Sequence, residues 1–325
     1  MIDSRLAAYV ARRLLQAIPL IFAVLTINFV LVHLAPGDPI TFLAGDQGTV
    51  AYFAEQRARY GLDEPLYQQY GRYLLSALRG DFGFSFSYGR SVFAIIIERV
   101  PATLLLMLTS QVIAVVVGIL GGVLAARHRG NWVGTALRTT AALGNAIPVF
   151  AAGQFFILFF AFRLDLFPTF GMESPRADYS GLRRMADIGH HLVLPAIALS
   201  LAEIGLLMRI TDASLRDLEG SDFVRTARAK GLRERTVTYR HMLRNALLPI
   251  VTVIGGRVGT LLTGAVLVET VFAWPGLGRL LFQAALARDY PLLMAMFIVS
   301  AASVVIANLA TDIAYALLDP RVKHG

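Results

Sequence analysis

The sequence contains no cysteine, and it has few charged residues for its length. The lack of cysteine excludes disulfides, thiolate zinc sites and a cysteine nucleophile. Only 16% of the 325 residues are charged, against about 25% in an ordinary soluble domain. Hydrophobic residues make up 56% of the chain, and the mean hydropathy is +0.61. This composition excludes a soluble enzyme of average make-up.

Lysine is also scarce, and its placement bears on catalysis. A phosphate-binding Walker loop needs a Gly-Lys pair, but the only two lysines, Lys230 and Lys323, follow alanine and valine. No Gly-x-Ser-x-Gly nucleophile elbow occurs. His190 and His191 are adjacent, so on a helix they point about 100° apart, and no third metal ligand is evident. We therefore expect no enzyme, no cofactor bound by this chain and no metal site.

Long apolar runs make up most of the chain. A helix that crosses a bilayer needs about 20 apolar residues. Four runs contain no Asp, Glu, Lys or Arg, and they cover residues 14–32, 100–126, 139–162 and 291–311. Two more, 192–208 and 246–272, are interrupted only by Glu203, Arg257 and Glu269. The sequence therefore predicts an all-α polytopic membrane protein with six transmembrane helices.

Charge predicts the side of the membrane on which each connecting segment lies. With both termini in the cytoplasm, the inner segments hold 17 basic and 7 acidic residues and cover 1–13, 127–138, 209–245 and 318–325. The outer segments hold 12 of each and cover 35–99, 163–191 and 273–290. Inner segments of membrane proteins usually carry the positive excess. Because the charges of the net +8 chain lie between apolar runs, this pattern also argues against nucleic-acid binding.

These boundaries define the predicted domains. A cytoplasmic N-terminus over 1–13 precedes a retained first transmembrane helix over 14–34, since its run is longer than the roughly 7–15 residues of a signal peptide. An extracytoplasmic cap follows over 35–99, with a predicted helix over 65–78. The aromatics at 82, 84, 86 and 88 alternate with other residues, which indicates a short strand or extended segment whose rings pack as core. A core membrane domain over 100–317 and a cytoplasmic tail over 318–325 complete the chain.

Three ionisable residues at membrane depth, Glu203, Arg257 and Glu269, are candidates for a translocation pathway, because such groups usually face water or a partner. Glu203 and Arg257 have opposite charge, so an ion pair and a pathway lining both remain open. Gly255 and Gly259 form a G-x-x-x-G motif, which lets helices approach closely.

A non-helical turn, Trp274-Pro275-Gly276, precedes the last span. A Pro-Gly pair does not continue a helix. Non-helical backbone at this depth must be buried in protein or solvated. We expect Glu269 to hold the turn by accepting backbone hydrogen bonds, and we include the three turn residues among the pathway or gate candidates.

The segment between the fourth and fifth spans carries the clearest functional signal. Ser221 or Asp222 can cap a short helix, and Gly231 suits the left-handed residue that ends it. Phe223 and Ala227 are four residues apart and share a predicted apolar face. That face either enters a groove on another protein or belongs to a basic loop on anionic lipid headgroups. The predicted contact residues are Asp222, Phe223, Val224, Arg225, Thr226, Ala227, Arg228, Ala229, Lys230, Gly231 and Leu232.

This segment resembles the EAA-type coupling loop of binding-protein-dependent ABC importer permeases, whose pattern is Glu-Ala-Ala, three residues, Gly and a downstream apolar-Pro. Gly231 and Pro249 stand at the glycine and proline positions. Arg225, Thr226 and Ala227 stand at the Glu-Ala-Ala positions, so only the third residue agrees.

The longer sequence at 223–232, Phe-Val-Arg-Thr-Ala-Arg-Ala-Lys-Gly-Leu, is similar to the sequences of the dipeptide/oligopeptide/nickel branch of this family. Other stretches resemble that branch in order, and they are residues 35–39, 61–66, 79–83, 99–104 and 268–278. The cap resembles that of the first of the two permeases in a peptide importer.

The resemblance implies a multi-pass permease subunit of the bacterial inner (plasma) membrane that forms half of a peptide pathway. By the same resemblance, it pairs with a homologous second permease and two ATPase subunits, which bind ATP and Mg²⁺, and an extracytoplasmic binding protein delivers the cargo. Residues 225–231 would then move with the ATPases and tilt the spans. Oligopeptide, dipeptide, glutathione and nickel chelate all remain open as cargo, with peptide first.

An ion-coupled secondary transporter is the alternative. That class uses acids at the bilayer midplane and often repeated halves. Membrane acids are few in this sequence and no repeat is visible, which disfavours that alternative.

Overall fold

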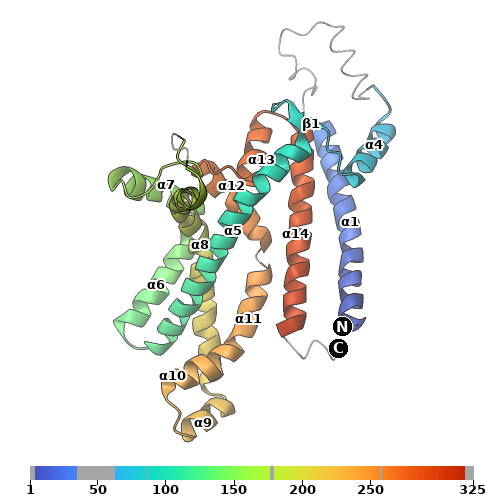
Figure 1. Ribbon diagram of the computed structural model, residues 1–325. Coiled ribbons are helices and arrows are strands. Elements are labelled where there is room, and N and C mark those ends of the chain that lie inside the picture. Colours follow the sequence, from blue (N-terminus) through green and yellow to red (C-terminus); the bar gives the residue numbers. More distant parts are fainter. Residues whose placement is uncertain (1–3, 35–62, 86, 176–178, 257, 319–325) are drawn as a thin grey trace. The chain divides into compact units, whose positions relative to one another are not determined.

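The computed structural model describes residues 4–34, 63–85, 87–175, 179–256 and 258–318, and it is almost entirely helical (Figure 1). The chain divides into two compact units. The first comprises residues 1–101 and 279–306, and the second comprises 102–278 and 307–325.

The first unit contains α1 (Ser4–Leu34), α4 (Leu66–Leu78) and the beginning of α14 (Tyr290–Leu318). The helix predicted over 65–78 is confirmed as α4, which begins directly after Pro65. Phe29 of α1 packs edge-on against Tyr70 of α4 with ring centroids 5.2 Å apart. The buried Asn28 amide donates a hydrogen bond to the Met294 carbonyl at 2.9 Å. These contacts fix α1 against α4 and α14.

A two-stranded hairpin in the same unit corrects one expectation. Strand β1 (Phe84–Ser85) pairs antiparallel with β2 (Arg90–Ser91). The prediction that the aromatics pack as core is wrong for Phe84, which is 47% exposed, whereas Ser85 is fully buried. The physical reason is the buried carboxylate of Asp289, which accepts hydrogen bonds from the Ser85 hydroxyl at 2.5 Å and the Ser87 N–H at 3.1 Å. Position 86 lies outside the described residues.

The second unit is a helical bundle. It contains most of α5 (Val92–Arg127), and then α6 (Trp132–Ala146), α7 (Val149–Phe156), the π-helix η2 (Ile157–Arg163) and α8 (Gly181–Glu219). After α8 come α9 (Asp222–Ala229), α10 (Glu234–Thr236), the π-helix η3 (Val237–Met242), α11 (Leu243–Gly256) and α12 (Val258–Val271). Helix α13 (Leu277–Leu286) begins where this unit ends. Leu106, Leu199, Val268, Phe272 and Trp274 are among its buried core residues.

Glycines let three helices of this unit approach very closely. A Cβ on Gly205 of α8 would lie 2.3 Å from the Ala141 carbonyl oxygen of α6. A Cβ on Gly122 of α5 would lie 2.5 Å from the Thr211 Cβ of α8. Backbone therefore packs directly against neighbouring helices, as is common in membrane bundles.

Within the described residues, three helices are long and apolar enough to cross a membrane: α5, α8 and the 290–309 part of α14. A bent pair, α6 with the α7–η2 stretch, qualifies as a fourth. The predicted all-α membrane class is thus supported. The run 139–162 is not one continuous helix, because α6 and the 149–163 stretch meet at an angle of 104°. Pro148 explains the break, since it disfavours the helical conformation of the preceding residue, and Ile147 is extended.

Two other predicted segments are largely helical. The run 246–272 is helical in α11 and α12 up to Val271, apart from residue 257, which lies outside the described part of the chain. The connecting segment predicted over 209–245 begins inside α8, which continues as a regular helix to Glu219.

Candidate functional site

Helix α9 occupies most of the predicted contact segment, at one end of α8 and α11 (Figure 1). Gly231 ends it as predicted, with a left-handed φ of +73°. The Gly231 N–H donates to the Arg228 carbonyl at 2.9 Å, and the Leu232 N–H donates to the Ala227 carbonyl at 3.3 Å. These two bonds form a Schellman motif, in which glycine is the usual left-handed residue.

The predicted cap at the start of α9 is wrong. Ser221 has the extended backbone of an N-cap residue, but its side chain makes no capping hydrogen bond. The Ser221 hydroxyl instead donates to the Leu218 carbonyl at 2.6 Å. Only two residues separate α8 from α9, so this hydroxyl satisfies a terminal carbonyl of α8 rather than an N–H of α9.

The buried face of α9 also differs from the expectation. Val224 is fully buried and Ala227 is 5% exposed, whereas Phe223 is 39% exposed. The prediction that Phe223 and Ala227 share a face turned toward a partner or lipid is therefore wrong for Ala227, because Ala227 packs with Val224 against the chain. They pack in a small apolar core with residues of α5, α8, η3 and α11, namely Val123, Leu215, Val237, Met242 and Ala246. This leaves Phe223 available to a partner.

Polar contacts fix the ends of α9. The Arg225 guanidinium donates from Nε and Nη2 to the Gly220 carbonyl at 3.2 and 2.8 Å, which satisfies the C-terminal end of α8. Arg228 donates to both carboxylate oxygens of Glu234 at 2.7 and 3.2 Å and lies 3.8 Å from Glu219. The hydrogen bond that Arg228 donates to Glu234 raises the pKa of Arg228 above its ordinary value. Glu219 also pairs with Arg129 of the α5–α6 turn.

The exposed side chains of this segment are mostly basic. Phe223 and Leu232 are both exposed there. Asp222 and Glu234 are the acidic residues of 220–245. Against them stand seven basic residues, all exposed: Arg225, Arg228, Lys230, Arg233, Arg235, Arg240 and Arg244. The surface can therefore bind a partner with an apolar groove and negative charge around it.

The second candidate region is the turn after α12. Glu269 is fully buried and accepts a hydrogen bond from the Thr103 hydroxyl of α5 at 2.7 Å. The same Thr103 oxygen accepts the Leu277 N–H at 2.7 Å. Trp274 is fully buried, and its Nε1–H donates to the Ala102 carbonyl at 2.9 Å. Glu269 thus reaches the turn backbone through Thr103, a bridging residue that sequence reasoning missed.

Close packing completes the turn. A Cβ on Gly276 would lie 2.1 Å from Glu269 Oε1, and one on Gly278 would lie 2.5 Å from the Val266 Cα. Ala273 adopts a left-handed φ of +51°. The break predicted at Pro275 is confirmed, since α12 ends at Val271 and α13 begins at Leu277.

The structure brings Glu269, Trp274, Pro275 and Gly276 together, but it places Glu203 elsewhere. Glu203 lies in α8 and is 4% exposed. Arg257 lies outside the described residues, and so does the Glu203–Arg257 pair that the sequence left open. Gly255 and Gly259 lie in α11 and α12.

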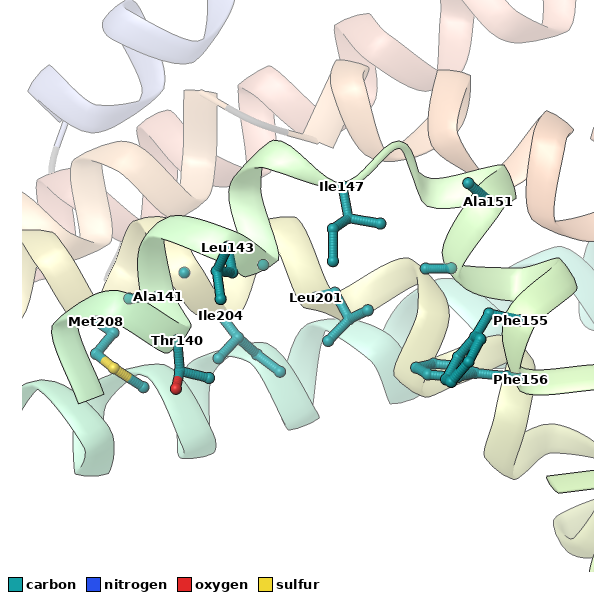
Figure 2. Close-up of a pocket in the computed structure, with 13 residues that line it drawn as sticks. Thr140, Ala141, Leu143, Ile147, Ala151, Phe155, Phe156, Leu201, Ile204 and Met208 are labelled. Carbon is teal, nitrogen blue, oxygen red and sulfur yellow. The ribbon is translucent and has the colours of Figure 1, made fainter. Parts of the chain in front are cut away.

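An apolar cavity of about 360 Å³ lies in the bend between α6 and α7, against α8. Figure 2 shows Ile147 at the bend, with Phe155 and Phe156 of α7 and Leu201 and Ile204 of α8 around the same space. No sequence signal pointed to this cavity, because it depends on the bend at Pro148.

The two adjacent histidines contact backbone carbonyls. His190 Nε2 lies 2.9 Å from the Leu166 oxygen, and His191 Nδ1 lies 2.9 Å from the Asp187 oxygen. Over the part of the chain that the structure describes, no group of three or more His, Asp or Glu side chains is arranged to hold a metal.

Comparison with known proteins gives consistent results. The family model "Binding-protein-dependent transport system inner membrane component" matches residues 118–324, and the N-terminal model of the same transport systems matches 6–107. The oligopeptide transport system permease protein AppB of Bacillus subtilis (strain 168) is 40% identical, over 98% of this chain and 100% of its own length. The glutathione transport system permease protein GsiC of Escherichia coli (strain K12) is 39% identical, over 97% and 99%.

A solved structure agrees at the level of the fold. An inward-facing structure of the MetNI methionine ABC transporter has a chain with a TM-score of 0.55 and 17% identity, which covers 69% of this chain and 96% of its own length. Together, the family models and the relatives confirm the resemblance to importer permeases that the sequence motifs indicated.

Proposed function

The chain belongs to the family of binding-protein-dependent transport system inner membrane components, and we propose that it forms half of the pathway of a peptide importer. Membership makes it a multi-pass inner-membrane permease subunit of an ABC importer and not an enzyme. The observation that carries the peptide proposal is the near-complete alignment, at 40% identity, with an oligopeptide permease.

The cargo class follows from what the relatives' names share. One relative is named for oligopeptides and another for glutathione, and both cargoes contain peptide-type amide bonds and free carboxylates. We therefore favour short peptides over nickel chelates. The alternative of an ion-coupled transporter finds no support among these relatives.

The proposed topology has six spans with both termini in the cytoplasm. It is supported by α5, α8, α14 and the bent α6–η2 pair as span candidates and by the basic excess of the inner segments. In this topology the segment over 35–99 caps the outer face, and α9 faces the cytoplasm. The Trp274–Gly276 turn then lies near the outer face, where we propose that it borders the pathway.

In this topology α9 is the docking element for an ATPase subunit. Its inner face is packed through Val224 and Ala227, and its outer face presents Phe223 among exposed cations. A helix of eight residues is too short to be stable alone. Because its inner face is packed and both ends are tied to the bundle, displacement of α9 would be passed to the transmembrane helices. We propose a homologous second permease, two ATPase subunits that bind ATP and Mg²⁺, and an extracytoplasmic binding protein as the other components.

Phe223 gives the direct test of docking. Full-length Phe223→Asp should lose about tenfold or more of the co-purified ATPase subunits and of ATP-driven peptide uptake in proteoliposomes, because a charge replaces a central apolar contact. The matched control Phe223→Leu keeps an apolar side chain and should retain both. If Phe223→Asp instead keeps its ATPase subunits and only loses binding to anionic vesicles, α9 is a lipid-facing segment and the docking proposal is wrong.

A further inference from the structure

We propose that Asp212 and Arg138 form the joint through which movement of α9 reaches α6 and the bend at Pro148. Asp212 lies in α8 and is 2% exposed. Its Oδ2 accepts a hydrogen bond from Arg138 Nε of α6 at 3.1 Å and another from Arg216, one turn further along α8. One buried carboxylate therefore has two cationic partners, of which only Arg138 belongs to another helix.

Arg138 extends the connection to a third helix. Its Nη2 donates to the Ala125 carbonyl near the end of α5 at 2.9 Å. The carbonyls in the last turn of a helix have no partner within that helix, so this bond satisfies one of them. A single arginine thus joins the end of α5, the body of α6 and the buried acid of α8. Sequence reasoning missed it, because only the Asp212–Arg216 spacing of four residues is readable without the fold.

The joint lies between the docking helix and the bend. Asp212 is seven residues from Glu219, or about 10 Å along α8. At Glu219, Arg228 of α9 and Arg129 of the α5–α6 turn approach the same carboxylate. On the other side of the joint, α6 leads to Pro148 and α7, where the Gly153 Cβ position lies 3.0 Å from the Phe272 ring and 3.3 Å from Val271. A continuous series of contacts therefore connects α9 to the residues just before the Trp274 turn.

The contact between α6 and α8 also includes close backbone packing. Gly144 and Gly205 bring the two backbones together with no interlocking side chain at those positions. These glycine contacts include no polar side chain, whereas a buried ion pair can fix the register of two helices. Removing one partner of a buried pair is costly because the other charge remains buried. Asp212 already has Oδ1 buried with no hydrogen-bond partner among the described residues, so it depends strongly on the contacts that it has.

Two matched variants separate a joint from a general charge effect. Arg138→Met and Arg216→Met each remove one cation from Asp212, but only Arg138→Met breaks the connection between helices. With the full chain in its complex with ATPases and binding protein, we expect Arg138→Met to lower peptide imported per ATP hydrolysed by about fivefold or more. We expect Arg216→Met to leave that ratio near the wild-type value.

The measurement distinguishes this inference from a purely structural role of Arg138 and from a failure of the proposed function. A purely structural role of Arg138 would lower the yield and the thermal midpoint of the complex but leave peptide per ATP unchanged, which would overturn the inference. Equal loss of coupling in both variants would overturn it as well. The inference rests on the proposed function, which fails separately if the wild-type complex shows no ATP-driven peptide uptake. Arg138→Lys, which keeps the charge but not both directions of hydrogen bonding, should have an intermediate ratio.

Discussion

The α9 segment and the Trp274 turn both depend on a glycine, but for different physical reasons. At Gly231 the backbone has a φ of +73° and a Cβ would meet nothing within 4 Å, so conformation alone requires glycine. At Gly276 the position of a Cβ is already occupied by the Glu269 carboxylate, 2.1 Å away. The α9 segment is thus constrained by its backbone and is exposed at Phe223, whereas the turn is constrained by packing and closed around a buried acid.

This difference has a functional meaning. A surface that binds and releases a partner needs a defined backbone with free space around it. A turn that contains a buried carboxylate needs every polar atom satisfied, since an unsatisfied one is costly in an apolar environment. We therefore expect changes at the turn to act on the stability of this unit, and changes at α9 to act on coupling.

Gly276→Ala should have the largest effect. The added methyl group must displace the Glu269 carboxylate, which hydrogen-bonds Thr103, and overpacking of this severity costs about 3 kcal/mol or more. The measurement is the thermal unfolding midpoint in detergent. Gly189→Ala is the control, because a Cβ there meets nothing within 4 Å in the middle of a helix. Equal midpoints for the two variants would show that the turn does not pack against Glu269.

Thr103→Val tests the bridging hydroxyl and should be the next largest. It leaves the Leu277 N–H and one oxygen of the buried Glu269 without this partner, which costs about 2–3 kcal/mol. Thr103→Ser keeps the hydroxyl and should lose much less. Unchanged stability of the valine variant, measured by the same unfolding experiment, would mean that Glu269 holds the turn without Thr103.

Features set by backbone conformation were predictable from the sequence, whereas features set by packing were not. The left-handed Gly231 and the break at Pro275 were both predictable, because each depends on the conformational preference of a single residue. The Val224–Ala227 face of α9 was not, since two faces of a short helix carry apolar residues and only the fold decides which one is covered. The bridge through Thr103 and the Asp212–Arg138 pair join residues 166 and 74 positions apart. No local pattern reports such a distance.

The smallest effect on stability, with a large effect on transport, is expected for Gly231→Val. A β-branched residue at a φ of +73° is strained by about 1–2 kcal/mol, and the strain falls on the Schellman motif that ends α9 rather than on the membrane bundle. Insertion and the unfolding midpoint should change little, while peptide uptake per ATP hydrolysed should fall. Gly231→Asn is the matched control, because asparagine tolerates the left-handed region, and it should transport nearly normally. Normal uptake in the valine variant would show that the end of α9 does not transmit movement. The difference between the open α9 segment and the packed Trp274 turn would then have no consequence for transport.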